Sequence, residues 1–225
     1  KGIEMGGGNR TLSEIAKEHL TNPLLILSGP NLAREVAQNL PAATTIAGDQ
    51  GVSQRVAAML HHSYFRCYTS EDTIGVQIAG ALKNVLSIAC GITHGMGLGH
   101  NAAAALLSRG LIEMRRLGLH LGATSDTFMG LAGIGDLVLT CSSELSRNFS
   151  LGIALGRGET LESILAKRVS VTEGVYTAKA IYELSNRLDF ELPICEIVYR
   201  ILYESLPIHE AFEQLAARPL TQEIY

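Results

Sequence analysis

The stretch from Ile74 to Ile92 constrains the fold most, because it is the most apolar part of the chain. Gln77, Lys83 and Asn84 interrupt it, and this pattern fits a buried helix better than a membrane span. We therefore predict that no apolar run is long enough to cross a bilayer and that the chain does not insert into membranes. The segment should instead be a core helix of a helical unit.

The pattern of the chain changes near residue 72. Before it, helical patterns at 11–20, 32–40 and 52–62 alternate with short strand signals at 24–27, 43–47 and 65–69, as in an α/β sheet. Thr11 and Glu14 have the spacing of a capping box at the first helix. After it, helical patterns cover residues 74–92, 102–121, 149–155, 161–166, 175–186, 194–204 and 208–217. The sequence thus predicts an α/β part over residues 1–72 and an all-helical part over residues 73–225.

Charge and composition exclude several classes of function. The net charge of −4 provides no overall positive field for a nucleic-acid backbone, so a small anionic ligand would need local cationic groups. The seven histidines form no metal motif, and adjacent His61 and His62 would point to different faces of a helix. The four cysteines are far apart, without a Cys-x-x-Cys pair, which is typical of reduced, mostly buried thiols in a cytosolic protein.

Lys83 is the first candidate for chemistry, because it lies inside the most apolar predicted helix. Its neighbours on the same helical face are Ala79, Gly80, Leu86 and Ser87, and none of them carries a charge. Small neighbours leave room for a ligand, and a buried amine suits proton transfer to a carbonyl oxygen. The alternative is a lysine that extends from the helix edge into solvent.

Asp136 is the second candidate, because glycines precede it and apolar residues follow it. Gly133 and Gly135 allow a sharp backbone turn, and the Leu-Val-Leu segment after Asp136 buries it. A buried carboxylate near Lys83 would tune that lysine or accept bonds from substrate hydroxyls. The alternative is an N-cap of the following helix.

Ser146, Arg147 and Asn148 precede a helical pattern. They supply a hydroxyl, a planar guanidinium and an amide beside the N–H groups of a helix start, which are the parts of a phosphate site. The alternative is an ordinary helix start, where such residues are also common.

These motifs, taken in order, resemble the bacterial-type glycerol-3-phosphate dehydrogenases along essentially the whole chain. They are Lys-Gly-Ile-Glu at 1–4, Ser-Gly-Pro-Asn-Leu-Ala-Arg-Glu at 28–35, Gly-Ala-Leu-Lys-Asn-Val at 80–85, Gly-Ile-Gly-Asp-Leu at 133–137, Ser-Arg-Asn at 146–148 and Thr-Glu-Gly at 172–174. The Gly-Ala-Leu-Lys-Asn block and the Gly-Asp-Leu-Val-Leu-Thr-Cys block are together quite specific.

The resemblance implies an enzyme that reduces dihydroxyacetone phosphate to sn-glycerol 3-phosphate with NADH or NADPH. The product of this family feeds phospholipid synthesis. The implied fold is a Rossmann domain, of which residues 1–72 are the C-terminal part, followed by a helical domain like that of 6-phosphogluconate dehydrogenase. A cytoplasmic homodimer is also expected.

The resemblance also implies site residues at the matching positions. Lys83 would be the proton donor and acceptor, and Lys1 a second active-site lysine that touches both substrate and cofactor. The remaining substrate contacts would be Gly29, Asn31, Asp136, Thr140, Ser146, Arg147 and Asn148. The remaining cofactor contacts would be Ala33, Arg147, Val171 and Glu173. No metal is expected.

The sequence departs from the family pattern in two respects. The Gly-x-Gly-x-x-Gly loop and the first strands are missing, because the chain begins at Lys1. This chain is therefore expected to bind cofactor poorly and to be inactive alone, with activity in a longer protein. Asn31 stands where many bacterial relatives carry Thr, but its amide still donates and accepts hydrogen bonds.

Two other functions remain open from the residues alone. One is a related dehydrogenase for an unphosphorylated hydroxyacid or ketopantoate, against which the Ser-Arg-Asn triplet argues. The other is a helical dimerisation module without activity, in which Lys83 would be replaceable. The choice between NADH and NADPH also remains open, because the selecting residues precede Lys1.

Overall fold

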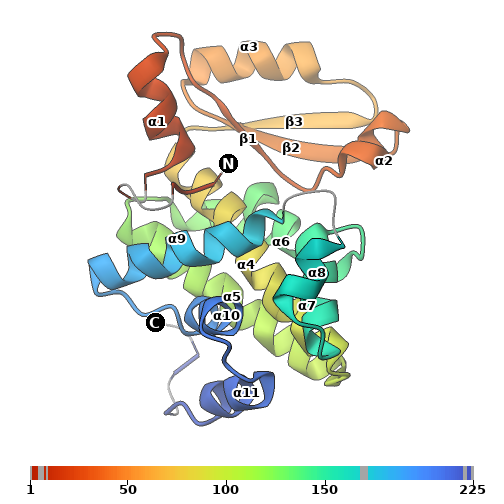
Figure 1. Ribbon diagram of the computed structural model, residues 1–225. Coiled ribbons are helices and arrows are strands. Elements are labelled where there is room, and N and C mark those ends of the chain that lie inside the picture. The colour runs from red at the N-terminus through yellow and green to blue at the C-terminus, as the bar shows by residue number, and fades with distance from the viewer. Residues whose placement is uncertain (1, 5–7, 9, 168–171, 220–221, 224–225) are drawn as a thin grey trace.

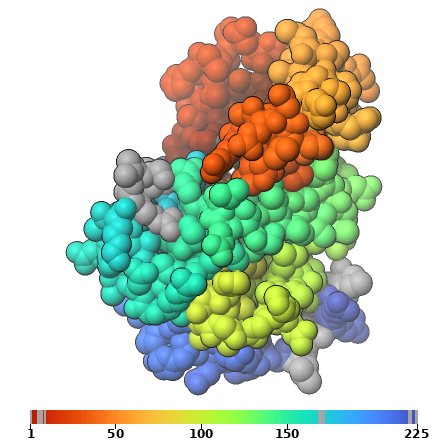
Figure 2. All heavy atoms as spheres, turned by 90° about the vertical axis from the view of Figure 1, so that its right-hand side faces the viewer, coloured from red at the N-terminus to blue at the C-terminus, as the bar shows by residue number. Residues whose placement is uncertain are grey.

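The chain folds into a small α/β layer stacked on a larger helical layer, as the computed structural model shows (Figure 1). The structure describes every residue except 1, 5–7, 9, 168–171, 220–221 and 224–225. In the space-filling view, the orange atoms that follow the first strand lie directly on green atoms from the middle of the chain (Figure 2). The two layers therefore meet where the first strand ends.

The α/β layer contains the strands β1 (Ile26–Ser28), β2 (Ala42–Ala47) and β3 (Phe65–Ser70), with β2 in the centre. β1 pairs antiparallel with β2, and β2 pairs parallel with β3. The helices of this layer are α1 (Leu12–His19), α2 (Ala33–Ala37) and α3 (Gln50–Leu60). Thr11 and Glu14 form the predicted capping box at α1.

Helix α2 is shorter than the sequence pattern predicts. The prediction was residues 32–40, whereas the helix ends at Ala37. Asn39 adopts a positive φ of 57°, and Pro41 follows two residues later. Leu40, the residue before this proline, is disfavoured in the helical region of φ and ψ. The backbone therefore leaves the helix before the apolar pattern of the sequence ends.

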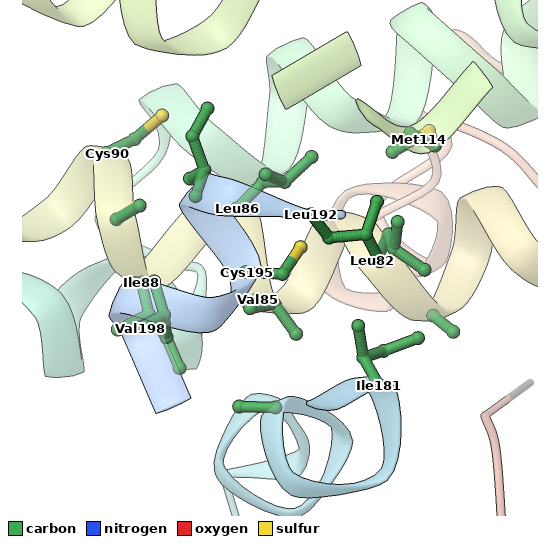
Figure 3. Close-up of a cluster of buried hydrophobic side chains, with 14 of the residues drawn as sticks. Leu82, Val85, Leu86, Ile88, Cys90, Met114, Ile181, Leu192, Cys195 and Val198 are labelled. Atoms are coloured by element: carbon green, nitrogen blue, oxygen red, sulfur yellow. The ribbon is translucent and has the colours of Figure 1, made fainter. Parts of the chain in front are cut away.

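Helix α4 (Thr73–Gly95) is the centre of the helical layer. The other helices are α5 (Gly99–His120), α6 (Asp136–Ser142), α7 (Arg147–Gly156), α8 (Leu161–Ala166), α9 (Glu173–Leu188), α10 (Pro193–Tyr203) and α11 (Ile208–Ala216). Figure 3 shows side chains of α4 packed among those of α5, α9, α10 and the residue just before α10: Leu82, Val85, Leu86, Ile88, Met114, Ile181, Leu192, Cys195 and Val198. Each such large apolar side chain contributes roughly 1.5–3 kcal/mol when fully buried.

By length and composition, α4 is able to cross a membrane, which corrects the expectation that no run is long enough. However, 89% of its apolar window is buried inside the protein. The apolar surface of α4 is therefore explained by the helices that cover it.

The segment between α5 and α7 is helical to a larger extent than predicted. It holds a 3-10 turn (Ser125–Met129), a short π-type turn (Leu131–Gly135) and α6. The backbone kinks at Gly133, where a Cβ atom would collide with the main chain of Phe128. Since glycine disfavours helices, tertiary packing rather than local propensity forms this segment.

Helices α4 and α7 cross at glycines, which lets their backbones come very close. The Cβ of an alanine at Gly152 would lie 2.9 Å from the Cα of Gly91 and would collide with the carbonyl oxygen of Ile88. The same holds one turn later, where a Cβ at Gly156 would lie 3.0 Å from the Cα of Gly95. These contacts fix the start of α7 relative to α4.

Candidate active site

Lys83 and Asp136 form a buried ion pair between α4 and α6. Nζ of Lys83 donates a hydrogen bond of 2.5 Å to Oδ1 of Asp136. The side chains are 12% and 3% exposed, respectively. The alternative of a lysine extending into solvent is therefore wrong, and the carboxylate expected near Lys83 is Asp136.

Further side chains hold both oxygens of Asp136. Oδ2 accepts a bond of 3.4 Å from the Ser28 hydroxyl, and Oδ1 lies 3.3 Å from the Thr140 hydroxyl, whose shorter bond of 2.6 Å goes to the backbone carbonyl oxygen of Asp136. Helix α6 begins at Asp136 itself, and no side chain caps it. The alternative role of Asp136 as an N-cap is therefore wrong.

The predicted phosphate-binding residues lie at the start of α7. Ser146 caps this helix by accepting a bond from the backbone N–H of Phe149, while the Arg147 side chain is exposed. Asn148 is buried: its Nδ2 donates to Oδ1 of Asn84 at 2.9 Å, and its Oδ1 accepts from the N–H of Gly174 at 2.9 Å. Nδ2 carries two N–H groups, so one remains for a ligand oxygen.

The ion pair and the start of α7 are joined through α4. Ser87, one helical turn after Lys83, donates 2.7 Å to the carbonyl oxygen of Thr140 and lies 3.3 Å from the Ser146 hydroxyl. Asn84, next to Lys83, contacts Asn148. The structure thus brings the predicted proton donor and the predicted phosphate site to one side of one helix.

The end of β1 completes the same region. Gly29 has φ of 156°, and a Cβ there would lie 2.9 Å from the main chain of both Ala43 and Thr44, so the position requires glycine. Nδ2 of Asn31 is buried and has no hydrogen-bond partner among the described residues. A buried donor without a partner is unfavourable, so Asn31 fits the role of a ligand contact.

The predicted cofactor contacts are at helix starts. Ala33 is the first residue of α2 and Glu173 the first residue of α9, and both are exposed. Lys1 and Val171 lie outside the described residues. Their predicted roles remain predictions.

Sequence reasoning missed three polar residues of this network: Ser28, Asn84 and Ser87. Asn84 had a detectable signal, because it is a second polar residue beside Lys83 in an apolar helix. Ser28 and Ser87 are common hydroxyl residues whose contacts arise only from tertiary structure.

Other chemistry is not supported near the ion pair. Contact with Cys90 and burial raise the pKa of the Cys141 thiol well above its ordinary value, so Cys141 is not an activated nucleophile. No group of three or more potential metal ligands occurs among the described residues. A cavity of about 830 Å³ is lined by helices α4, α5, α10 and α11, and no predicted site residue that the structure describes lines it.

Comparison with known families decides the assignment. The family model described as NAD-dependent glycerol-3-phosphate dehydrogenase C-terminus matches residues 72–213. The chain belongs to this dehydrogenase family. The corresponding N-terminus model matches residues 1–52. The boundary at residue 72 remains a prediction.

Relatives of the dehydrogenase family cover nearly all of this chain. The glycerol-3-phosphate dehydrogenase [NAD(P)+] of Rhodospirillum rubrum is 50% identical over 99% of the chain and 64% of its own length. That of Caulobacter vibrioides is 48% identical over 99% of the chain and 68% of its length. The chain thus spans about two thirds of the length of the curated relatives that it matches.

Solved structures of glycerol-3-phosphate dehydrogenases share the fold. The enzyme from Coxiella burnetii superposes with a TM-score of 0.92 at 41% identity, covering 97% of this chain and 67% of that chain. The enzyme from Saccharomyces cerevisiae gives 0.85 at 31% identity, covering 96% and 66%. The predicted fold class, a Rossmann tail followed by an all-α domain, is confirmed.

Proposed function

We propose that the full-length protein reversibly reduces dihydroxyacetone phosphate to sn-glycerol 3-phosphate with NADH or NADPH. The observation that carries this proposal is the Lys83–Asp136 pair, joined through Ser87 to the Ser146 cap of α7. A proton donor and an anion-binding helix start so connected suit a small substrate with a carbonyl at one end and a phosphate at the other.

Lys83 provides the proton. When hydride reaches the carbonyl carbon, negative charge develops on the oxygen, and the Lys83 ammonium stabilises this charge and then donates a proton to it. Asp136 holds Nζ in place, and the Thr140 hydroxyl lies beside the Oδ1 that Lys83 contacts. In the reverse direction, the neutral amine accepts the proton of the substrate hydroxyl.

The start of α7 holds the phosphate. The Arg147 guanidinium supplies charge and paired N–H donors, and the start of the ten-residue helix supplies backbone N–H groups and the positive end of the helix dipole. Ser146 and the second N–H of Asn148 add neutral donors. This set favours a phosphorylated substrate over a plain hydroxyacid.

The N-terminal layer positions the reacting atoms. Asn31 offers its unpartnered buried amide to a ligand oxygen, and Gly29 leaves space for the chain to lie close to β2. Ala33, Arg147 and Glu173, together with Lys1 and Val171, would hold the dinucleotide, and their exposed helix-start positions, where described, fit an extended ligand. When bound, the nicotinamide supplies the hydride.

The test is an assay of hydride transfer by the full-length protein, in which the decrease in NADH or NADPH absorbance is measured. Dihydroxyacetone phosphate should be reduced far faster than unphosphorylated 2-keto acids or ketopantoate. Lys83→Ala should lower kcat by about 10²–10⁴-fold, the range of general-acid catalysis, when measured on protein that circular dichroism shows to be folded at the assay temperature. Lys167→Ala, which removes an exposed lysine paired with Glu159, is the control and should have normal turnover.

Normal turnover by Lys83→Ala would contradict the role of Lys83. Preference for an unphosphorylated acid would favour the related hydroxyacid or ketopantoate reductases. The homodimer is a separate proposal, tested by light scattering on the full-length protein.

A further inference from the structure

We propose that Ser28 is a positioning residue for the Lys83–Asp136 pair, so that the N-terminal layer controls the geometry of the proton donor in the helical layer. This inference rests on the proposed function. It is carried by the hydroxyl of Ser28, which bonds Oδ2 of Asp136 at 3.4 Å although the two residues are 108 positions apart.

The backbone of Ser28 is held firmly by the neighbouring strand. Ser28 pairs with Thr45 in the register of β1 and β2, and its carbonyl oxygen accepts a bond of 3.2 Å from the Thr44 hydroxyl. Both Ser28 and Thr44 are completely buried. The close approach of Gly29 to β2 holds the next residue as well. The Ser28 hydroxyl is therefore presented from a rigid position.

The Asp136 carboxylate lies between the two layers. Its Oδ1 accepts a bond from Lys83 of the helical layer and its Oδ2 accepts one from Ser28 of the N-terminal layer, so each oxygen has a donor from a different layer. The turn before Asp136 packs on the loop after β1, where a Cβ at Gly135 would be 3.6 Å from the Pro30 ring. A carboxylate held through both oxygens cannot rotate about its terminal torsion, and Nζ of Lys83 then has one preferred place.

Removal of the Ser28 hydroxyl should release this rotation without touching the phosphate site. Oδ2 then loses one buried donor, and the carboxylate is held less firmly in the position that aligns Nζ with the substrate oxygen. Substrate binding through Arg147 is unaffected. The expected effect of Ser28→Ala is a fall in kcat of about tenfold, the size of one lost hydrogen bond to a charged group, with KM changed by less than about twofold.

A double-mutant cycle separates this role from a merely structural one. In the full-length protein, kcat and KM for dihydroxyacetone phosphate are measured for Ser28→Ala alone and in an Asp136→Asn background. If Ser28 acts through Asp136, the fall in kcat should largely disappear in that background. Ser28→Thr keeps the hydroxyl and should restore most of the activity. The control is Ser53→Ala, which changes another fully buried serine of the N-terminal layer. The Ser53 hydroxyl donates to the carbonyl oxygen of Gln50 within α3, so this variant should have normal kcat and KM.

Several results would overturn the proposal. These are an equal fall in kcat in both backgrounds, an effect confined to KM, or an unchanged Ser28→Ala enzyme. Crystal structures of the wild type and of Ser28→Ala provide a second measurement that does not depend on activity. In the variant, the Asp136 carboxylate should rotate about its terminal torsion and displace Nζ of Lys83 from its wild-type position, while the ion pair itself persists. An unmoved carboxylate overturns the role of Ser28, whereas a wild type that reduces no triose phosphate overturns the proposed function instead.

Discussion

Lys83 and Asp136 are 53 residues apart in sequence and form a 2.5 Å ion pair that is almost completely removed from solvent. A buried pair of this kind is weak as a source of net stability, because both charges lose their hydration. Breaking it is costly all the same, since the remaining charge is left buried without a counter-charge. The pair therefore ties the stability of the helical layer to the chemistry of the site.

The first prediction concerns this coupling. Asp136→Asn should lower the free energy of unfolding by about 3 kcal/mol, because it leaves the Lys83 ammonium buried without its counter-charge. The double variant Lys83→Met/Asp136→Asn should lose less than the single variant, since no charge then remains. Urea denaturation at neutral pH measures both. Additive losses in the double variant would show that the two side chains do not interact energetically.

The second prediction concerns the phosphate. Arg147→Ala should lower kcat/KM for dihydroxyacetone phosphate by roughly 30- to several-thousandfold, which corresponds to about 2–5 kcal/mol for a lost charged contact. Unphosphorylated dihydroxyacetone should be affected little, because it lacks the group that Arg147 binds. Arg157→Ala, an exposed arginine that follows the other end of α7, is the matched control. An equal loss for both substrates would place Arg147 outside the phosphate site.

The third prediction concerns the crossing of α4 and α7. Gly152→Ala should destabilise the protein by about 1–3 kcal/mol, the usual cost of overpacking, because the added methyl group meets the backbone of α4. It should also raise KM for the phosphorylated substrate, since the start of α7 has to move. Gly51→Ala in α3 is the control, because a Cβ there would make only an ordinary contact of 3.5 Å with Oδ1 of Asp49 and alanine favours a helix. Thermal unfolding and steady-state kinetics give the two readouts; an unchanged melting temperature for Gly152→Ala would contradict the packing.

The fourth prediction concerns pH. Burial raises the pKa of Glu113 from its ordinary value of 4.5 to about 7, and its carboxylate accepts bonds from the N–H groups of Ile194 and Cys195 at the start of α10. The folded state then binds more protons than the unfolded state between these two pH values, so this group destabilises the fold as pH rises through that window. Glu113→Gln removes the effect. Relative to that variant, the wild type should lose about 3 kcal/mol of unfolding free energy between pH 4.5 and 7.

Urea denaturation of both proteins across this pH range measures the difference. Glu162→Gln, which changes an exposed carboxylate on α8, controls for the loss of one charge. A difference between wild type and Glu113→Gln that stays constant from pH 4.5 to 7 would rule out the titration of Glu113.

The helical pattern of the sequence predicted most elements of this fold, because apolar residues at helical spacing decide which face of a helix is buried. Helix 161–166 was predicted with the observed bounds, and helix 175–186 lies within the longer α9. The glycine-rich segment before Asp136 was not predicted as helical, since local propensity opposes a helix there; in the structure Gly133 lies so close to the main chain of Phe128 that only glycine fits.

The sequence predicted which residues belong to the candidate site, but not which of them are in contact. A lysine in an apolar helix and an aspartate after two glycines are visible in one sequence, yet nothing local indicates that they touch. Their contact, like that of Ser28 with Asp136, depends on how the layers stack. Family resemblance named the residues; the structure shows which of them are bonded to one another.

The glycine crossing of α4 and α7 has a consequence for substrate length. The separation between the Lys83 amine and the start of α7, the proposed phosphate site, is set by main-chain contacts at Gly91 and Gly152, and main-chain contacts do not adapt as side chains do. A three-carbon phosphate should span this separation, whereas a homologue with one more carbon should be accommodated only if the helices move apart. Selectivity for chain length would then come from the backbone rather than from any residue that touches the ligand.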